Sequence, residues 1–194
     1  MKTTWYNEKE LKDLGLKSYG NNVLLSRQTS IYSPELVSLG NNVRIDDFCV
    51  LSGEIEFQDY VHIGQYTGLY GQNRIKFEPF GGTSAGCLVY STTSDYSGEH
   101  LSSPMVPEPF RYSTGGPVIF EKHAFIGAGS VVLPKVILKE GSVVGAMSLV
   151  TKNLDPWTIY AGIPVKKIKE RKKNLINLEI KLKEYLLELN GKEK

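Results

Sequence analysis

The sequence predicts an all-β repeat fold, a parallel β-helix, and two runs of apolar residues are the basis for this prediction. Within each run the residues are six positions apart. The first run is Leu39, Ile45, Leu51, Phe57, Ile63, Leu69 and Ile75, and the second is Phe120, Ile126, Val132, Leu138, Val144 and Val150. An α-helix repeats every ~3.6 residues and a strand every ~2. A strict repeat of six indicates coils in which each hexad supplies one short strand and one turn.

Length and composition place the chain among soluble globular proteins with one sizeable core. It has 194 residues, 41% hydrophobic and 23% charged, and its net charge of +2 is too small to indicate nucleic-acid binding. The two cysteines, Cys49 and Cys87, form no CxxC pair, which argues against a zinc or disulfide scaffold. The first residues lack the apolar run of a signal peptide, and no segment is apolar enough to span a bilayer. We therefore expect a cytoplasmic protein.

The N-terminal half is expected to contain a short helical segment and then the first coils. Residues 1–19 form the N-terminal segment, in which Asn7 and Glu10 have the spacing of a capping box and Gly15 would end the helix. The β-helix is expected over 20–165, with an irregular first coil at 20–38 and the strict repeat at 39–77.

The repeat is interrupted between its two runs. Ile75 and Phe120 are 45 positions apart, which is not a multiple of six. Residues 87–94 still have the composition of a strand, but 95–117 are dense in Gly, Pro, Ser and charged residues and predict a long loop excursion. Because such loops inside a compact domain are more often functional than accidental, we expect this excursion to bind a ligand.

The C-terminal end predicts a change from strands to helix. Pro156 and Pro164 would end strand pairing. Over 166–194, apolar residues recur at helical spacings, with Lys and Glu between them. We expect an amphipathic helix that covers the open end of the β-helix, where the backbone of the last coil would otherwise be unpaired.

Three segments resemble the hexapeptide-repeat acyltransferases. HAFIGAGSVVLPKVILKEGSVVGAMSLVTK (123–152) and AGIPVKKIKER (161–171) match the family's repeat region and its end. TTSDYSGEHLSSPMVPEPFR (92–111) is similar to the branch of surface-polysaccharide and O-antigen pathways that includes N-acetyltransferases of dTDP-4-amino-4,6-dideoxyglucose. The resemblance implies a left-handed β-helix, a homotrimer with active sites between subunits, and acetyl-CoA as the co-substrate without a metal. It also implies a nucleotide-linked sugar as the acceptor, and neither nucleic acid nor membrane as a partner.

The same resemblance implies which residues bind the coenzyme. Small residues in the turns would border the pantetheine arm, and cations near the end of the repeat would meet the phosphates. The implied set is Phe125, Gly127, Ala128, Gly145, Ala146, Thr151, Lys152, Lys166 and Lys167.

Acetyl transfer needs a group that accepts a proton from the attacking atom. Many O-acetyltransferases of this family have a histidine at the end of the coil before the HAFIG-type motif, where this chain has Asp95. His100 lies five residues later and is able to orient against Asp95 as a carboxylate–imidazole pair. His123 begins the motif beside the thioester. Asp95, His100 and His123 are the candidate catalytic residues, each with a structural or surface role as the alternative.

The acceptor residues are chosen by chemical type, aromatic for stacking and polar for hydroxyl groups. The candidates are His62, Tyr70, Asn73, Tyr90, Tyr96 and Glu99. An amine acceptor needs less help from a base than a hydroxyl, so the aspartate at position 95 favours N-acetylation. Three alternatives stay open: a sugar O-acetyltransferase, a zinc hydro-lyase of the same fold, and a trimeric scaffold without catalysis. The residues do not decide the sugar, the nucleotide or the acyl group.

Overall fold

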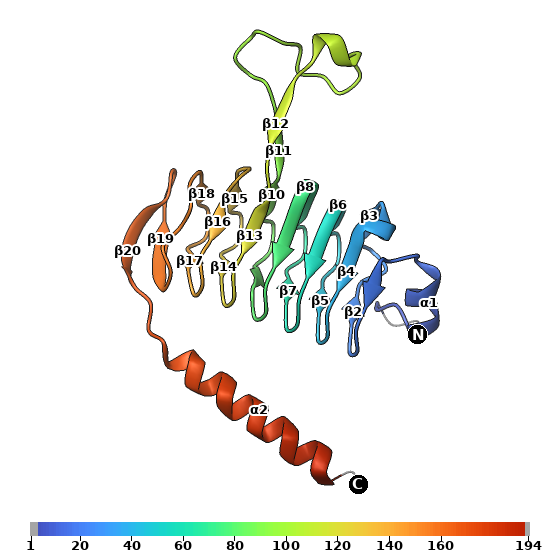
Figure 1. Cartoon of the computed structure of the whole chain (residues 1–194), viewed down its shortest axis with the longest axis vertical. Helices are drawn as coiled ribbons and strands as arrows, with labels where there is room; N and C mark the ends of the chain where they lie inside the picture. The colour runs from blue at the N-terminus through green and yellow to red at the C-terminus, as the bar shows by residue number, and fades with distance from the viewer. Residues whose placement is uncertain (1–3, 193–194) are drawn as a thin grey trace.

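Short parallel strands stack along one axis into a β-solenoid in the computed structural model, which describes residues 4–192 (Figure 1). The ten-stranded sheet contains β1 (Ser18–Tyr19), β3 (Ser30–Tyr32), β4 (Val37–Leu39), β6 (Val50–Phe57), β8 (Gly68–Phe77), β10 (Leu88–Tyr90), β13 (Val118–Phe120), β15 (Val131–Val132), β16 (Ile137–Leu138) and β18 (Leu149–Val150). The eight-stranded sheet contains β2 (Leu24–Leu25), β5 (Arg44–Ile45), β7 (His62–Ile63), β9 (Gly82–Thr83), β14 (Phe125–Ile126), β17 (Val143–Val144), β19 (Thr158–Ala161) and β20 (Lys166–Glu170).

The hexad residues form the core of the solenoid, as the sequence predicts. Every residue of the two runs is buried, and none is more than 3% exposed. Phe57, Phe77 and Phe120 stack through successive coils, with ring centroids 5.4 and 4.2 Å apart. Because each coil buries its apolar side chains only against the next coil, the repeat stabilises the stack as a whole.

The register of the repeat shifts earlier than the sequence indicates. Leu51 pairs with Leu69, but Phe57 pairs with Phe77, and Ile75 pairs with Ile55. A bulge beside Gly53 accommodates the extra residues of β8. The expectation of a strict repeat through Ile75 is therefore wrong in register, although Ile75 is itself fully buried. Spacing in the sequence does not reveal the shift, because both positions are apolar.

The short N-terminal helix forms as predicted. Helix α1 spans Glu8–Asp13, and both hydrogen bonds of the capping box between Asn7 and Glu10 are present, at 2.8 and 3.0 Å. Leu11 is its buried residue and packs on the core. Residues 1–3 of the predicted segment lie outside the described residues.

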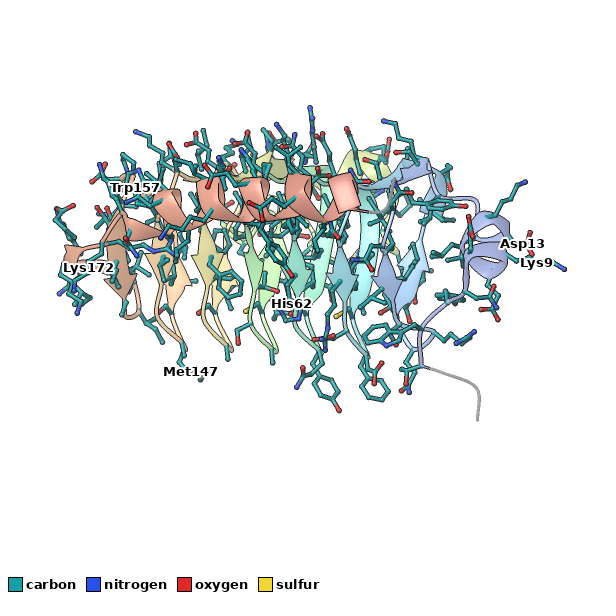
Figure 2. The ribbon with its side chains drawn as sticks, turned by 90° about the horizontal axis from the view of Figure 1, so that it is seen from below. Lys9, Asp13, His62, Met147, Trp157 and Lys172 are labelled. Atoms are coloured by element: carbon teal, nitrogen blue, oxygen red, sulfur yellow. The ribbon has the colours of Figure 1, made fainter. Side chains whose placement is uncertain are left out.

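The C-terminal segment differs from the prediction in two ways. Lys166–Glu170 form strand β20, which pairs antiparallel with β19, and helix α2 begins only at Asn174 and runs to Lys192. The helix does not cover the end of the solenoid but lies alongside the coils (Figure 2). Strand β20 supplies the backbone partners that the edge of β19 requires, so the edge needs no helix. Residues 193–194 lie outside the described residues.

The excursion leaves the solenoid on an antiparallel stem and projects away from it (Figure 1). The stem consists of β11 (Thr92–Ser94) and β12 (Ser113–Gly115), and a 3-10 turn at Glu108–Phe110 lies in the loop between them. The two 3-10 turns of the chain are this one and Pro34–Leu36 within the described residues. In residues 4–192, no helix has both the length and the apolar character needed to cross a membrane.

Candidate active site

The stem of the excursion is anchored to the bulged strand β8 through Asn73. The Asn73 N–H donates to Ser91 Oγ at 2.8 Å, and its side-chain amide donates to the Ser91 carbonyl at 3.2 Å. Ser91 Oγ in turn donates to the Tyr70 carbonyl at 2.9 Å. These bonds give Asn73 a structural role at the base of the excursion, next to the cavity but not in its lining.

A cavity of about 420 Å³ lies between the solenoid and the excursion. The stacked rings of Tyr70 and Tyr90, 4.9 Å apart and nearly parallel, contribute its aromatic wall. Burial raises the pKa of the Tyr90 phenol, which keeps it neutral. Its remaining lining is mostly hydroxyl-bearing or polar: Ser52, Gln72, Thr92, Thr93, Ser94, Leu101, Ser102, Pro104, Arg111, Tyr112 and Ser113. A polar pocket with an aromatic wall suits a sugar.

Asp95 and His100 form the predicted pair; neither is in the lining of the cavity, but their chain neighbours Ser94 and Leu101 are. Asp95 Oδ2 lies 2.8 Å from His100 Nδ1, and the His100 ring packs on Tyr112 with centroids 5.4 Å apart. The Ser97 backbone N–H and hydroxyl, followed by His100, lower the pKa of the Asp95 carboxyl to about 2. The carboxylate is therefore ionised at neutral pH and holds the imidazole by one nitrogen.

Two further predicted residues lie on the outer part of the excursion. The Glu99 carboxylate, the Asp95 carboxylate and His100 bring their ligand atoms within 4.8 Å of one another. Glu99 thus adds negative charge beside the imidazole. The Tyr96 side chain is 80% exposed and lies outside the cavity lining.

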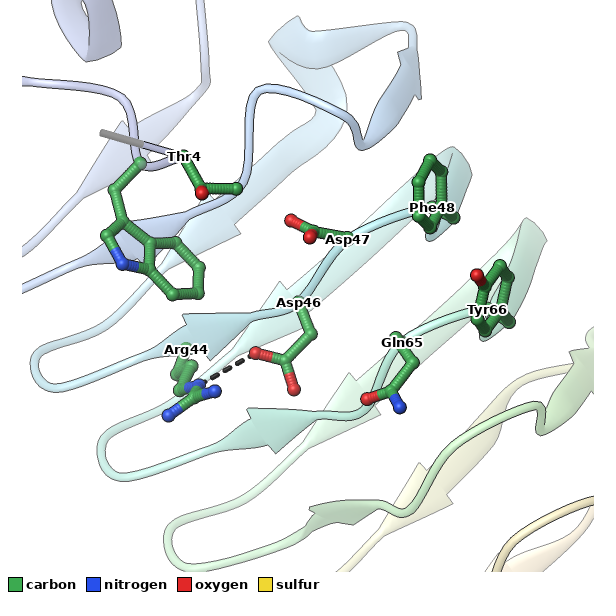
Figure 3. A pocket seen from close by; sticks show the side chains of 8 residues that line it. Thr4, Arg44, Asp46, Asp47, Phe48, Gln65 and Tyr66 are labelled. Carbon is green, nitrogen blue, oxygen red and sulfur yellow. Dashed lines mark hydrogen bonds and ion pairs between the residues drawn. The ribbon is translucent and has the colours of Figure 1, made fainter. Parts of the chain in front are cut away.

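His62 lies apart from the excursion, on strand β7 of the other sheet (Figure 2). Its Nε2 is 2.9 Å from Asp46 Oδ2, and Arg44 Nε donates to the same carboxylate at 2.7 Å. Asp46 lines a second cavity of about 330 Å³, together with the exposed, stacked rings of Phe48 and Tyr66 (Figure 3). The structure does not bring His62 to the cavity of the excursion.

His123 lies beneath helix α2. Its Nε2 is 3.0 Å from Glu179 Oε2, and its ring stacks on Phe80 with centroids 5.1 Å apart. Burial lowers the pKa of His123 against the opposing effect of Glu179, so the imidazole is neutral and donates to the carboxylate. Arg171 donates to the His123 carbonyl at 2.8 Å. These partners attach the helix to the coil, a role that sequence spacing does not reveal.

The predicted coenzyme residues Gly127–Ala128 and Gly145–Ala146 follow β14 and β17 of the eight-stranded sheet, whereas Thr151 and Lys152 follow β18 of the ten-stranded sheet. A Cβ at Gly127 would lie 2.5 Å from the Ala146 nitrogen, so only glycine permits this approach between the coils. The N–H groups of Gly127 and Gly145 donate to the carbonyls of Val144 and Tyr160. They are therefore committed to the coil ladder, which excludes them as donors to an oxyanion.

The other coenzyme candidates are more open. Phe125 is half-buried on β14, whereas Ala146, Thr151, Lys152, Lys166 and Lys167 are exposed. Lys167 forms an ion pair with Glu170 that raises the pKa of the lysine. Lys166 lies next to it on β20.

Arg111 is a residue of this region that the sequence reasoning did not select. It lines the cavity. Its charge could have marked it as a candidate, because it is the only lysine or arginine in residues 95–117.

Known proteins match this chain over nearly its whole length. No protein-family model matches it. A dTDP-4-amino-4,6-dideoxy-D-glucose acyltransferase of Escherichia coli is 42% identical over 178 residues, which cover 90% of this chain and 93% of that protein.

Solved structures match at a similar level of identity. A variant of AntD, an N-acyltransferase from Bacillus cereus, in complex with dTDP-4-amino-4,6-dideoxyglucose and coenzyme A has a TM-score of 0.92 and 44% identity, covering 95% of this chain and all (100%) of that one. AntD with dTDP and 3-hydroxybutyryl-CoA gives a TM-score of 0.91, 45% identity and coverage of 97% and 100%. A hexapeptide-repeat acetyltransferase of Vibrio cholerae, with a TM-score of 0.58 and 17% identity over 85% of this chain and 76% of that one, shares the fold.

Proposed function

The chain belongs to the hexapeptide-repeat acyltransferases, and from that premise we propose that it transfers an acyl group from acyl-coenzyme A to the amino group of dTDP-4-amino-4,6-dideoxyglucose. The observation that carries the proposal is the 42% identity, over 90% of the chain, to an enzyme named for this substrate. The polar cavity near Asp95 and His100 is the structural observation that supports the proposal. The acylated sugar would enter a surface polysaccharide such as an O antigen.

The reaction is a direct attack of the amine on the thioester carbonyl. A carbon–nitrogen bond forms, the carbon–sulfur bond breaks, and coenzyme A leaves as the thiolate, which takes a proton. The amine nitrogen loses one proton during the same reaction. We assign the acceptance of this proton to His100, because Asp95 holds Nδ1 and Nε2 lies on the opposite side of the ring.

Asp95 is assigned the positioning of His100 rather than the proton transfer itself. A carboxylate whose pKa is about 2 is a weak base toward an ammonium group, whereas an imidazole is suited to neutral pH. The Asp95 carboxylate also stabilises the imidazolium that forms, and Glu99 adds to this effect from nearby. The arrangement is that of a base oriented by a third group.

The coenzyme is proposed to lie along the turns at Gly127–Ala128 and Gly145–Ala146, with its phosphates toward Lys152 and Lys166. Because the N–H groups of Gly127 and Gly145 are engaged, the oxyanion donor from these turns is the N–H of Ala128 or Ala146. We propose acetyl-CoA as the donor, with 3-hydroxybutyryl-CoA as the competing donor that the AntD complex suggests. No metal takes part in the proposed reaction.

We also propose a homotrimer in which each active site lies between two subunits, and a cytoplasmic location, where nucleotide sugars and acyl-CoA are both made. The excursion projects from the solenoid, which leaves space beside it for a neighbouring subunit (Figure 1). Sedimentation equilibrium tests the trimer directly.

The experiment that tests the function measures thiol release with acetyl-CoA and 3-hydroxybutyryl-CoA. The acceptors are 3-amino and 4-amino sugars linked to dTDP, UDP and GDP, together with the 4-hydroxy analogue of the proposed substrate. We expect turnover with the dTDP-linked 4-amino sugar. Preference for the 4-hydroxy analogue would overturn the proposal in favour of O-acetylation.

The role of His100 is tested by comparing a His100 variant with a His62 variant. His100→Ala is expected to lower kcat by about 10²–10⁴-fold, because a positioned base contributes that much. Added imidazole should restore part of the rate, since the His100 side chain is 38% exposed. His62→Asn is the control and should retain the rate, because His62 lies on the other sheet. Full activity in His100→Ala would remove the imidazole from the mechanism.

A further inference from the structure

Arg111 has a buried donor that no group of the protein satisfies. Within residues 4–189, whose side chains are described, its Nε atom is buried and has no hydrogen-bond partner. A buried donor without a partner costs free energy, and native proteins rarely leave one without a reason. Arg111 lines the cavity of the excursion, and its side chain as a whole is 35% exposed, so the rest of the guanidinium is open to a ligand there.

The charge of the cavity also points to an anion. Arg111 is its only charged lining residue, and no carboxylate lines it among the described residues. The other lining groups are hydroxyls, one amide and apolar surface. A single guanidinium surrounded by neutral donors is suited to phosphate oxygens, which accept two parallel hydrogen bonds from arginine.

The existing partner of Arg111 is weak. Arg111 Nη2 lies 3.7 Å from Glu108 Oε1, and the Glu108 side chain is 89% exposed. An exposed ion pair at this distance contributes little, so a phosphate displaces it readily. The backbone of Arg111 is nevertheless fixed, because its N–H donates to the Glu108 carbonyl at 3.2 Å. The arginine is therefore held in place while its charge is still available.

We propose that Arg111 binds the diphosphate of the nucleotide-linked acceptor and thereby selects a sugar nucleotide over a free sugar. This inference rests on the proposed function and names the residue that recognises the anionic part of that substrate. Tyr112, the next residue, packs against the His100 ring. Anchoring the diphosphate at Arg111 thus places the linked sugar beside Asp95 and His100.

The same chemistry also occurs in coenzyme A, which carries its own phosphates, and the test separates the two sources. Binding to the intact protein is measured by calorimetry with dTDP, with thymidine and with coenzyme A. Arg111→Gln is expected to raise the Kd of dTDP by about 10–100-fold, the range for a lost hydrogen bond to a charged group. The Kd values of thymidine and of coenzyme A should change less than about twofold, because neither ligand would use this residue.

Two further variants keep the test independent of folding. Arg111→Lys retains the charge without the paired donors and should give an intermediate Kd for dTDP. Glu108→Gln removes the competing carboxylate and should leave dTDP binding equal or tighter. An unchanged Kd of dTDP in Arg111→Gln, or a loss of coenzyme A binding instead, would overturn the inference.

Kinetics distinguish failure of this inference from failure of the proposed function. In Arg111→Gln the KM for the dTDP-linked amino sugar should rise more than kcat falls. If the parent protein acylates the nucleotide sugar and Arg111→Gln has the same KM, only this inference fails. If the parent protein acylates none of the amino sugars, the proposed function itself fails.

Discussion

The solenoid and the excursion are built by different means. In the solenoid, the apolar side chains of the two hexad runs are at most 3% exposed, and parallel ladders join each coil to the next. In the excursion, residues 96–105 are all exposed, and hydrogen bonds that the Ser97 N–H and the Ser102 hydroxyl donate to Asp95 hold the loop together. The free energy of folding therefore comes mainly from the solenoid, and we propose that the chemistry of the acceptor comes from the excursion.

Removal of the excursion should have the largest effect on acyl transfer and so tests this division most strongly. Replacing residues 95–112 by Asn-Gly joins the paired residues Ser94 and Ser113 through a two-residue hairpin turn. We expect transfer to fall by at least ~10³-fold, because the base and its positioning carboxylate are lost together. The melting temperature should change by only a few degrees, since loop length has a small effect on stability. Thiol release and thermal unfolding measure the two outcomes.

Coenzyme A binding is the internal control for that deletion. Calorimetry should give a Kd for coenzyme A close to that of the full chain, because its proposed contacts lie on the solenoid. Loss of coenzyme A binding together with transfer would show that the two regions are not separable.

A matched pair of phenylalanines tests the same division through stability. Phe120 is fully buried against Phe77, whereas Phe110 in the excursion is 63% exposed. Phe120→Ala should lower the free energy of unfolding by about 3–5 kcal/mol, through lost burial and the cavity left behind. Phe110→Ala should change it by less than about 0.5 kcal/mol. Urea denaturation measures both, and similar values for the pair would contradict the comparison.

The sequence predicts the solenoid well because its constraint is one-dimensional. Each inward position must be apolar in every coil, so a spacing of six in the chain becomes a stack in space. The register shift at β8 cannot be predicted from this spacing, because Ile75 and Phe77 are both apolar and both buried. Strand β20 cannot be predicted from the spacing either. All five of its residues are exposed, and it forms because its backbone pairs with the edge of β19.

The candidate site is predicted in part. Asp95 and His100 are five residues apart in one loop, and the contact expected from that closeness is confirmed, while their catalytic role is still a prediction. Arg111 and the His123–Glu179 contact depend on tertiary structure, since Glu179 is 56 residues from His123. No local pattern in the chain marks such pairs.

The attachment of α2 provides a smaller test within the solenoid. Burial alone would raise the pKa of Glu179, but bonds from Lys122, Lys183 and His123 outweigh it and hold the pKa at about 2. Glu179→Gln should lower the free energy of unfolding at pH 7 by about 1.5–3 kcal/mol, as for a lost hydrogen bond to a charged group. Transfer at saturating substrate should be retained if the helix is only structural.

The pH dependence of stability follows from the same carboxyl. The unfolded chain binds a proton below the ordinary Glu pKa of 4.5, whereas the folded protein keeps Glu179 ionised down to about 2. Its contribution is therefore complete above pH 4.5 and is lost as the pH falls from there toward 2. Melting temperatures at neutral and acidic pH should converge between the parent protein and Glu179→Gln as the pH falls. A constant difference would mean that another group holds the helix.

The smallest effect is expected for the lysines on β20, where the solenoid is proposed to meet the coenzyme phosphates. Lys167 is paired with Glu170, whereas Lys166 lies beside it on the same exposed strand. Lys166→Ala should raise the Kd of coenzyme A by about two- to fivefold, as for a solvent-screened charge, and the effect should shrink at high salt. Lys167→Ala should have less effect, because Glu170 already offsets its charge. Calorimetry with dTDP should give the parent Kd in both variants, because the diphosphate site belongs to the excursion; a parallel loss of dTDP affinity would show that the two regions share one anion site.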